Sequence, residues 1–165
     1  ELGRSCVHKD YRNKPIIKLL WKAISAYIFH YNIKFLFGCA SFPGINPKKY
    51  KKEFSYLYNN YLAPSEIRPI ALKKHHIKMN HHKKNEINEE LVFNNLPPLI
   101  KGYLRLGVKI GEGAVIDEQF NTIDICIVLN ASMMKKKYLK HYKKIGEVKN
   151  SKIIFFNNFF KKINK

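Results

Sequence analysis

The sequence predicts an α/β layered domain in which a mixed sheet is flanked by helices. Short apolar runs typical of strands alternate with longer segments at helical spacing, and this alternation predicts the layered arrangement. Of the 165 residues, 45% are hydrophobic and 13% are aromatic. A chain of this length and composition can bury one substantial core, so we expect a single globular domain.

The first half of the chain predicts a strand, a helix, a strand and a helix. Residues 1–7 alternate in the manner of a strand, and turn residues lead from there to Pro15, where a helix is expected to begin. Residues 16–29 carry their few polar side chains in one narrow stripe, which is typical of a helix buried against a sheet. Residues 35–42 are apolar on both faces, so we expect a central strand covered on each side and paired in parallel with the opening strand. A second helix is expected over 47–61.

The second half predicts fewer regular elements. Residues 73–90 are polar and poor in aromatic side chains, which indicates a surface excursion or mobile loop. Residues 96–107 predict a short helix that is opened by prolines and closed by Gly107. Residues 123–129 alternate as a further strand, and a helix rich in lysine and tyrosine should follow. We therefore expect one domain over 1–142, with its first strands preceding this sequence, and a basic-aromatic tail over 143–165.

The formal charge of +19 ordinarily indicates an anionic partner such as nucleic acid or a membrane surface. The 31 basic residues less four arginines leave 27 lysines, a bias that an AT-rich coding sequence also produces. A nucleic-acid-binding module is the non-catalytic alternative, but the lysines are scattered and form no recognised binding motif. We therefore expect no nucleic-acid partner.

The cysteines and histidines predict neither disulfides nor a metal site. Cys6, Cys39 and Cys126 each lie in an apolar, strand-like run, which predicts buried, reduced thiols in a reducing cytoplasm. The histidine pairs at 75–76 and 81–82 lack a fixed geometry for a metal ion. No stretch reaches the length of a membrane span, and no signal peptide is visible.

Four separated runs resemble those of bacterial ornithine N-acyltransferases, which are also called hemolysin-like proteins. The runs are ELGRSCV at 1–7, LFGCAS at 36–41, LPPLIKGYLR at 96–105 and FNTID at 120–124. The resemblance covers residues 1–142 and implies the fold of the GNAT acyltransferases. It also implies a 3-hydroxyacyl donor on acyl carrier protein, L-ornithine as the acceptor and lyso-ornithine lipid as the product. The first run also resembles, more distantly, the acyl-homoserine lactone synthases, so a related synthase with a different acceptor is the alternative enzyme.

The expected reaction, aminolysis of a thioester, requires a base for the amine and N–H groups for the oxyanion. Glu1 is the candidate base, with Arg4 on the same strand, and an ordinary ion pair between the two is the alternative. In the fold that the resemblance implies, this strand separates from its neighbour near the reacting centre. The backbone N–H groups of Ser5, Cys6 and Val7 would then be free for the thioester carbonyl.

The acceptor site should offer acidic groups for ammonium and an arginine for carboxylate. Asp117, Glu118 and Asp124 lie within eight residues of a chain that is poor in acids, and they are the candidates for the ammonium contacts. Arg105 is the candidate for the carboxylate, because its guanidinium forms paired hydrogen bonds with one. The alternative is that the aspartates cap turns and Arg105 lies on a solvated face.

The expected donor follows from residues 12–17. Acetyltransferases that use coenzyme A bind its pyrophosphate on a glycine-rich loop at a helix N-terminus. This stretch has no glycine, and Pro15 has no N–H to donate. We therefore expect no permanently bound cofactor and an acyl-phosphopantetheine thioester on acyl carrier protein as donor. The reduced cysteines predict a cytoplasmic enzyme, and peripheral contact with an anionic membrane is a further expectation. The basic residues expected to contact the acidic carrier are Lys9, Arg12, Lys14 and Lys18.

Overall fold

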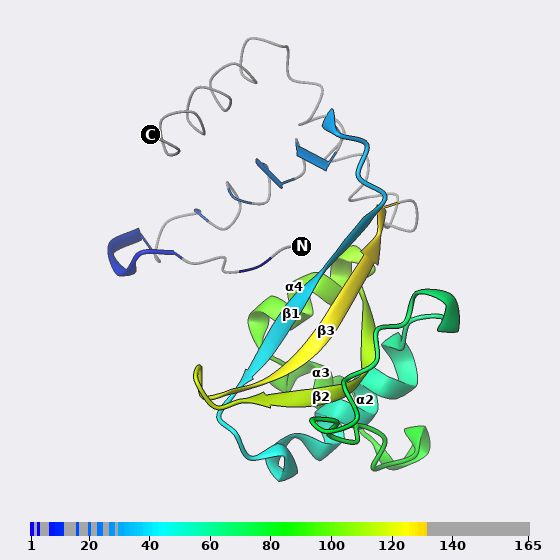
Figure 1. Cartoon of the computed structure of the whole chain (residues 1–165). Coiled ribbons are helices and arrows are strands. Elements are labelled where there is room, and N and C mark those ends of the chain that lie inside the picture. The colour runs from blue at the N-terminus through cyan, green and yellow to red at the C-terminus, as the bar shows by residue number, and fades with distance from the viewer. Residues whose placement is uncertain are drawn as a thin grey trace. The chain divides into compact units, whose positions relative to one another are not determined.

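The computed structural model describes residues 30–131 without interruption, together with residues 1, 3, 7–11, 16, 20, 23–24 and 27–28 (Figure 1). The chain divides into two compact units, one formed by residues 1–5 and 34–135 and the other by residues 6–33 and 136–165. The candidate site lies in the first of these units.

A three-stranded antiparallel sheet forms the centre of the first unit. The strands β1 (Phe35–Pro43), β2 (Lys109–Asp117) and β3 (Thr122–Asn130) lie in the order β1-β3-β2. The predicted α/β class is confirmed, and so is the strand expected over 123–129. The three strands of the described residues pair only in the antiparallel sense, and parallel pairing is confined to isolated bridges such as Leu62 with Ile110.

Strand β1 differs from its prediction. It forms an outer strand of the sheet in the described residues, and its burial alternates strictly along its length. Phe35 and Phe37 are 49% and 52% exposed, whereas Phe42 is fully buried. The expected cover on both faces of this strand is therefore wrong, because every second side chain of the apolar run faces out. Its expected central position stays a prediction. The predicted parallel pairing with residues 1–7 lies mostly outside the described residues.

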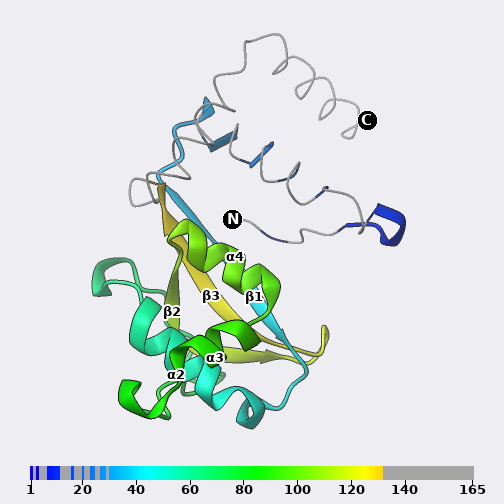
Figure 2. The same cartoon turned by 180° about the vertical axis from the view of Figure 1, so that it is seen from behind.

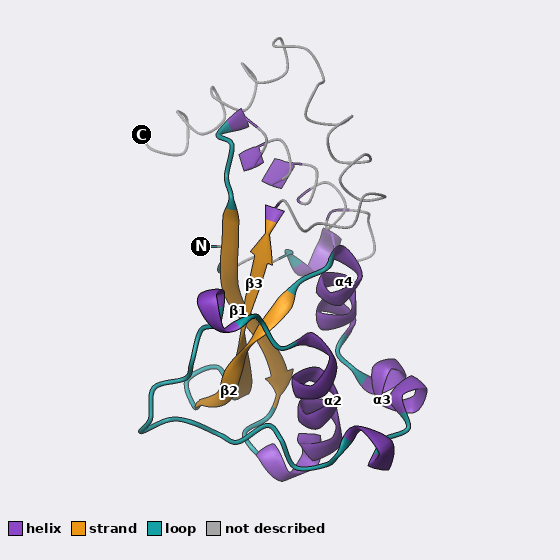
Figure 3. Ribbon diagram, turned by 90° about the vertical axis from the view of Figure 1, so that its right-hand side faces the viewer, coloured by secondary structure: helices purple, strands orange, loops and turns teal. Residues whose placement is uncertain are grey.

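Three helices of this unit cover one face of the sheet. They are α2 (Lys51–Tyr61), which follows the 3-10 turn Pro47–Tyr50, α3 (Glu89–Asn95) and α4 (Pro98–Leu106), as Figures 2 and 3 show. The rings of Phe42 and Phe54 meet edge to face at 5.2 Å between β1 and α2. The core therefore lies between the helices and this face of the sheet. The helices predicted over 47–61 and 96–107 are confirmed, and Gly107 ends α4 with a φ of 99°.

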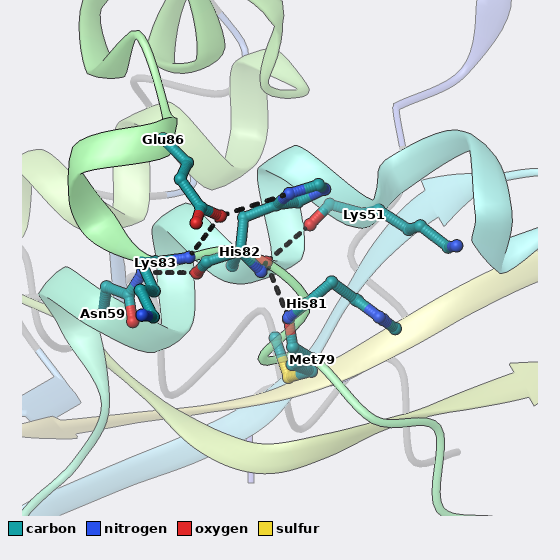
Figure 4. A network of polar contacts seen from close by, with 8 residues as sticks. Lys51, Asn59, Met79, His81, His82, Lys83 and Glu86 are labelled. Carbon is teal, nitrogen blue, oxygen red and sulfur yellow. Dashed lines mark hydrogen bonds and ion pairs between the residues drawn. The ribbon is translucent and has the colours of Figure 1, made fainter.

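The segment 73–90 is mostly exposed, but α2 anchors it at one point. Met79 is only 2% exposed, and Ser55 of α2 is fully buried beneath it. The Ser55 hydroxyl lies 2.8 Å from the Lys51 carbonyl and 3.2 Å from the Met79 carbonyl, and it accepts the backbone N–H groups of His81 and His82 at 2.9 and 3.0 Å (Figure 4). One buried hydroxyl therefore fixes the backbone of this segment against the helix.

The second unit is described only in part. Residues 9–11 form a 3-10 turn, and each described position from 16 to 30 is helical, in agreement with the helix expected there. The expected terminal helix and the tail over 143–165 lie outside the described residues. Among the described helices, none has both the length and the apolar character that crossing a bilayer would require.

Candidate functional site

An open cavity of about 1010 Å³ lies on the face of the sheet opposite the helices. Its floor is formed by side chains that point away from the core, among them Cys39 of β1 with Asp124 and Cys126 of β3. Its wall is formed by residues 69–77. We call residues 68–77 the strap.

The strap is held by an interruption in strand β2. The register of β2 against β3 shifts between Ile110 and Ala114, and the intervening backbone turns to the strap. The Glu112 N–H donates to the Pro69 carbonyl at 2.8 Å, and the Ala71 N–H donates to the Glu112 carbonyl at 2.9 Å. A β-bulge changes the direction of a strand. Here it lets the backbone of β2 form hydrogen bonds with the strap as well as with β3.

Further contacts fix both ends of the strap. Arg68 forms an ion pair with Glu112 at 3.2 Å and also donates to the Ala63 carbonyl at 2.8 Å. At the other end, Ile77 and Ala114 exchange two backbone hydrogen bonds of 2.8 and 3.0 Å. The wall of the cavity is therefore tied to the same strand that supplies part of its floor.

Two glycines allow the strap to approach β2 closely. A Cβ atom at Gly111 would lie 2.6 Å from the Pro69 carbonyl oxygen. Gly113 has a φ of 86°, and a Cβ atom there would meet the His76 ring, at 2.7 Å from Nε2. Neither position accepts a side chain without movement of the strap. The same glycines weaken the strand signal in the sequence, which explains why β2 was not predicted.

The structure brings the three predicted acidic residues together at the cavity. Asp117, Glu118 and Asp124 all line it. Asp117 Oδ1 also accepts the Phe120 N–H at 3.0 Å, so this aspartate caps the β2–β3 turn, as the alternative interpretation predicts. Asp124 Oδ1 is shielded from solvent and has no hydrogen-bond partner among the described residues.

The two described cysteines face each other across the sheet. Cys39 and Cys126 are directly opposed on β1 and β3, and both are free thiols. Cys39 is exposed at the cavity, so its predicted burial is wrong, and the reason is again the uncovered face of β1. Partial burial of the thiol raises the pKa of Cys39, and the negative charges of Asp124, Glu1 and Asp117 raise it further. Burial also raises the pKa of Cys126.

Glu1 lies within electrostatic reach of the same face. Its carboxylate adds to the rise in the Cys39 pKa, together with the carboxylates of Asp124 and Asp117. The negative charges of Glu1, Asp117 and Asp124 therefore all act on one thiol, that of Cys39. The role of Glu1 as a base stays a prediction.

The structure does not bring Arg105 to this group. Arg105 is exposed on α4, which covers the opposite face of the sheet, and its guanidinium carbon lies 5.8 Å from the centre of the Phe93 ring. Arg105 does not line the cavity. Its predicted contact with a carboxylate gains no support from this placement.

The other predicted site residues remain untested. Val7 and Lys9 belong to the second unit, Lys9 being exposed in the 3-10 turn. The predicted residues outside the described ones are Arg4, Ser5, Cys6, Arg12, Lys14 and Lys18.

The sequence did not point to His76 as part of the cavity. In the sequence, His76 stands out only as one member of the histidine pair at 75–76, which was considered as a metal site. The described residues contain no cluster of three or more His, Cys, Asp or Glu side chains suited to a metal ion. The available signal was the glycine pair at 111 and 113, since a glycine inside a strand pattern often marks the close approach of another segment.

Residues 1–22 match the family of acetyltransferase (GNAT) domains. Over 142 residues, 86% of this chain, the sequence is 41% identical to the L-ornithine N(alpha)-acyltransferase of Agrobacterium fabrum and covers 48% of that protein. It is 42% identical to the enzyme of the same name from Brucella abortus and 37% identical to that from Rhodobacter capsulatus, covering 50% and 54% of them. No solved structure matches the chain.

The chain thus spans about half the length of the curated relatives that it matches. This similarity over 142 residues confirms the resemblance to ornithine N-acyltransferases. Over 86% of its own length, this chain is similar to the L-ornithine N(alpha)-acyltransferases.

Proposed function

We propose that this chain is part of an N-acyltransferase that moves a 3-hydroxy fatty acyl group from acyl carrier protein to the α-amine of L-ornithine. The product would be lyso-ornithine lipid. The observation that carries the proposal is the similarity to relatives named L-ornithine N(alpha)-acyltransferase, at 37 to 42% identity over 86% of the chain.

The cavity supports an amine acceptor. Ornithine brings two ammonium groups, and Asp117, Glu118 and Asp124 offer carboxylates around one cavity. Leaving a buried acceptor unpaired costs about 1–3 kcal/mol, so the shielded Oδ1 of Asp124 favours a bound donor. An ammonium group supplies such a donor and neutralises the carboxylate. We therefore assign Asp124 to the direct contact with the acceptor and Asp117 to both the turn and the cavity.

The acyl donor is the second half of the proposal. A GNAT acyltransferase takes its acyl group from a thioester, and the absence of glycine in residues 12–17 favours a carrier-bound thioester over coenzyme A. Carrier proteins are acidic, so Lys9, Arg12, Lys14 and Lys18 would accelerate encounter, an effect that fades with added salt. The reaction would take place in the cytoplasm, with peripheral contact to the anionic membrane that receives the product.

Lipid analysis tests the activity and the acceptor. The natural full-length protein is expressed in a bacterial host that makes no ornithine lipid, and the lipid extract is examined by mass spectrometry. We expect a 3-hydroxyacyl ornithine that is absent from the host carrying an empty vector. An acyl-homoserine lactone or another N-acyl amino acid in its place would overturn the ornithine assignment.

Steady-state kinetics test the donor. Matched 3-hydroxyacyl chains are supplied on acyl carrier protein and on coenzyme A, and the carrier thioester should give the higher kcat/KM. The double variant Lys14→Glu with Lys18→Glu should raise the KM for the carrier thioester and leave the KM for the coenzyme A thioester nearly unchanged. Equal or better use of the coenzyme A thioester by the unaltered protein would refute the donor assignment.

A further inference from the structure

The overall reaction must release one proton. Ornithine arrives as an ammonium, and the products are a neutral amide and a neutral thiol, so one proton leaves for solvent in each turnover. A second proton leaves the nitrogen after the amine has attacked the thioester carbonyl. The departing thiolate takes up this proton and leaves as a neutral thiol. A base that takes the second proton from nitrogen and returns it to sulfur cannot account for the net release.

We propose that His76 removes this first proton from the ammonium of the acceptor and passes it to solvent. The inference rests on the proposed function and adds a catalytic residue to the same cavity. In this step an N–H bond of the ammonium breaks, its electron pair remains on nitrogen, and the proton forms an N–H bond with the neutral imidazole. The imidazolium then loses that proton to water, which restores the neutral ring.

The position of His76 is set by the backbone on both sides of it. The next residue, Ile77, exchanges two hydrogen bonds with Ala114, and the ring lies over Gly113, where only a glycine leaves room for it. His76 lines the cavity and is exposed. It can therefore contact both a bound acceptor and bulk water, as the release of a proton requires.

The choice of an imidazole over the neighbouring carboxylates follows from their chemistry. Proton transfer is most efficient when the pKa of the base lies near the working pH, and imidazoles ordinarily change charge between pH 5 and 8. Carboxylates ordinarily change charge several pH units lower, so they bind an ammonium as an ion pair more readily than they deprotonate it. The titratable groups that share the cavity with His76 are Lys74 and His75 on the strap, Asp117 and Glu118 at the β2–β3 turn, and Cys39, Cys126 and Asp124 on the sheet.

The test compares His76→Gln with His75→Gln in the natural full-length protein. His75 is the matched control because it is adjacent, lines the same cavity and is not placed over Gly113. The rate of ornithine acylation is measured from pH 6 to pH 10. We expect kcat/KM of His76→Gln to fall about 10- to 100-fold at pH 7 and the deficit to shrink toward pH 10, where ornithine arrives with a neutral α-amine. His75→Gln should stay within about 2-fold of the unaltered protein throughout.

Chemical rescue gives an independent readout that a structural role would not produce. Added imidazole should restore part of the pH 7 rate of His76→Ala and should not change that of His75→Ala. The inference is overturned if His76→Gln keeps full activity at pH 7, if its deficit is the same at every pH, or if imidazole rescues neither variant. An unaltered protein that does not acylate ornithine would refute the proposed function itself, whereas an active one with an unaffected His76→Gln would refute only this inference.

Discussion

Replacing the buried Ser55 by alanine is the sharpest test of how the segment 73–90 is held. The hydroxyl accepts the His81 and His82 N–H groups and lies within hydrogen-bonding distance of the Lys51 and Met79 carbonyls. A buried N–H left without its acceptor costs about 1–3 kcal/mol, and the partial exposure of both histidine amides puts each near the lower end of that range. Alanine gains about 0.5 kcal/mol of helix propensity in α2. The net expected loss of unfolding free energy is therefore about 1.5–3 kcal/mol.

Urea unfolding followed by circular dichroism measures this loss, and hydrogen exchange locates it. We expect a lower midpoint at unchanged slope and selectively faster exchange of the His81 and His82 amides. Ser65→Ala is the matched control, because Ser65 is exposed in the 3-10 turn Ser65–Ile67 and should change stability by less than about 0.5 kcal/mol. If the two variants lose equal stability, or if the two amides exchange at the original rate in Ser55→Ala, the hydroxyl does not hold the segment.

Three further predictions follow from the site. Glu1→Gln in the natural full-length protein should lower turnover by roughly 100-fold, the usual scale for a lost general base, and unchanged turnover in the acylation assay would remove Glu1 from the mechanism. Gly111→Ala should destabilise the protein by about 1–3 kcal/mol in urea unfolding, because its Cβ would lie 2.6 Å from the Pro69 carbonyl oxygen, and a neutral effect would show that the strap gives way freely. Cys39, whose pKa is raised by burial and by Asp124, should remain a thiol at pH 7 and react with iodoacetamide only as the pH rises toward and above 9. Asp124→Asn removes one raising charge, so alkylation of Cys39 should then begin at lower pH, and an unshifted profile would contradict this electrostatic coupling.

The elements with strong local signals could be predicted from the sequence. Prolines and Gly107 mark the ends of α4, and the alternation of isoleucines over 123–129 marks β3, because these patterns depend on backbone preferences and on burial of a single face. Strand β2 and helix α3 were missed. In β2 the glycines at 111 and 113 interrupt the alternation, and α3 has only seven residues, too few for a clear helical period.

The acidic part of the site could be predicted, and the rest could not. Asp117, Glu118 and Asp124 are close in sequence on either side of one turn, so any antiparallel β2–β3 pairing keeps them near each other. His76 is separated from them by about 40 residues and reaches the cavity only because the strap pairs with the bulge in β2. A contact of that kind depends on the register of two distant segments, for which a single sequence carries no signal.

The sequence by itself therefore determined the α/β class, the positions of the helices and strands with strong local signals, the acidic group and the similarity to ornithine N-acyltransferases. All of these depend on local patterns and motifs. Only the tertiary structure decided that, within the described residues, α2, α3 and α4 all lie on one face of the sheet, that the strap forms the wall of an open cavity on the other face, and that His76 lines this cavity. These features depend on which face of the sheet packs against the helices and on which backbone groups form hydrogen bonds with the bulge in β2. Both are contacts between segments that lie far apart in the chain.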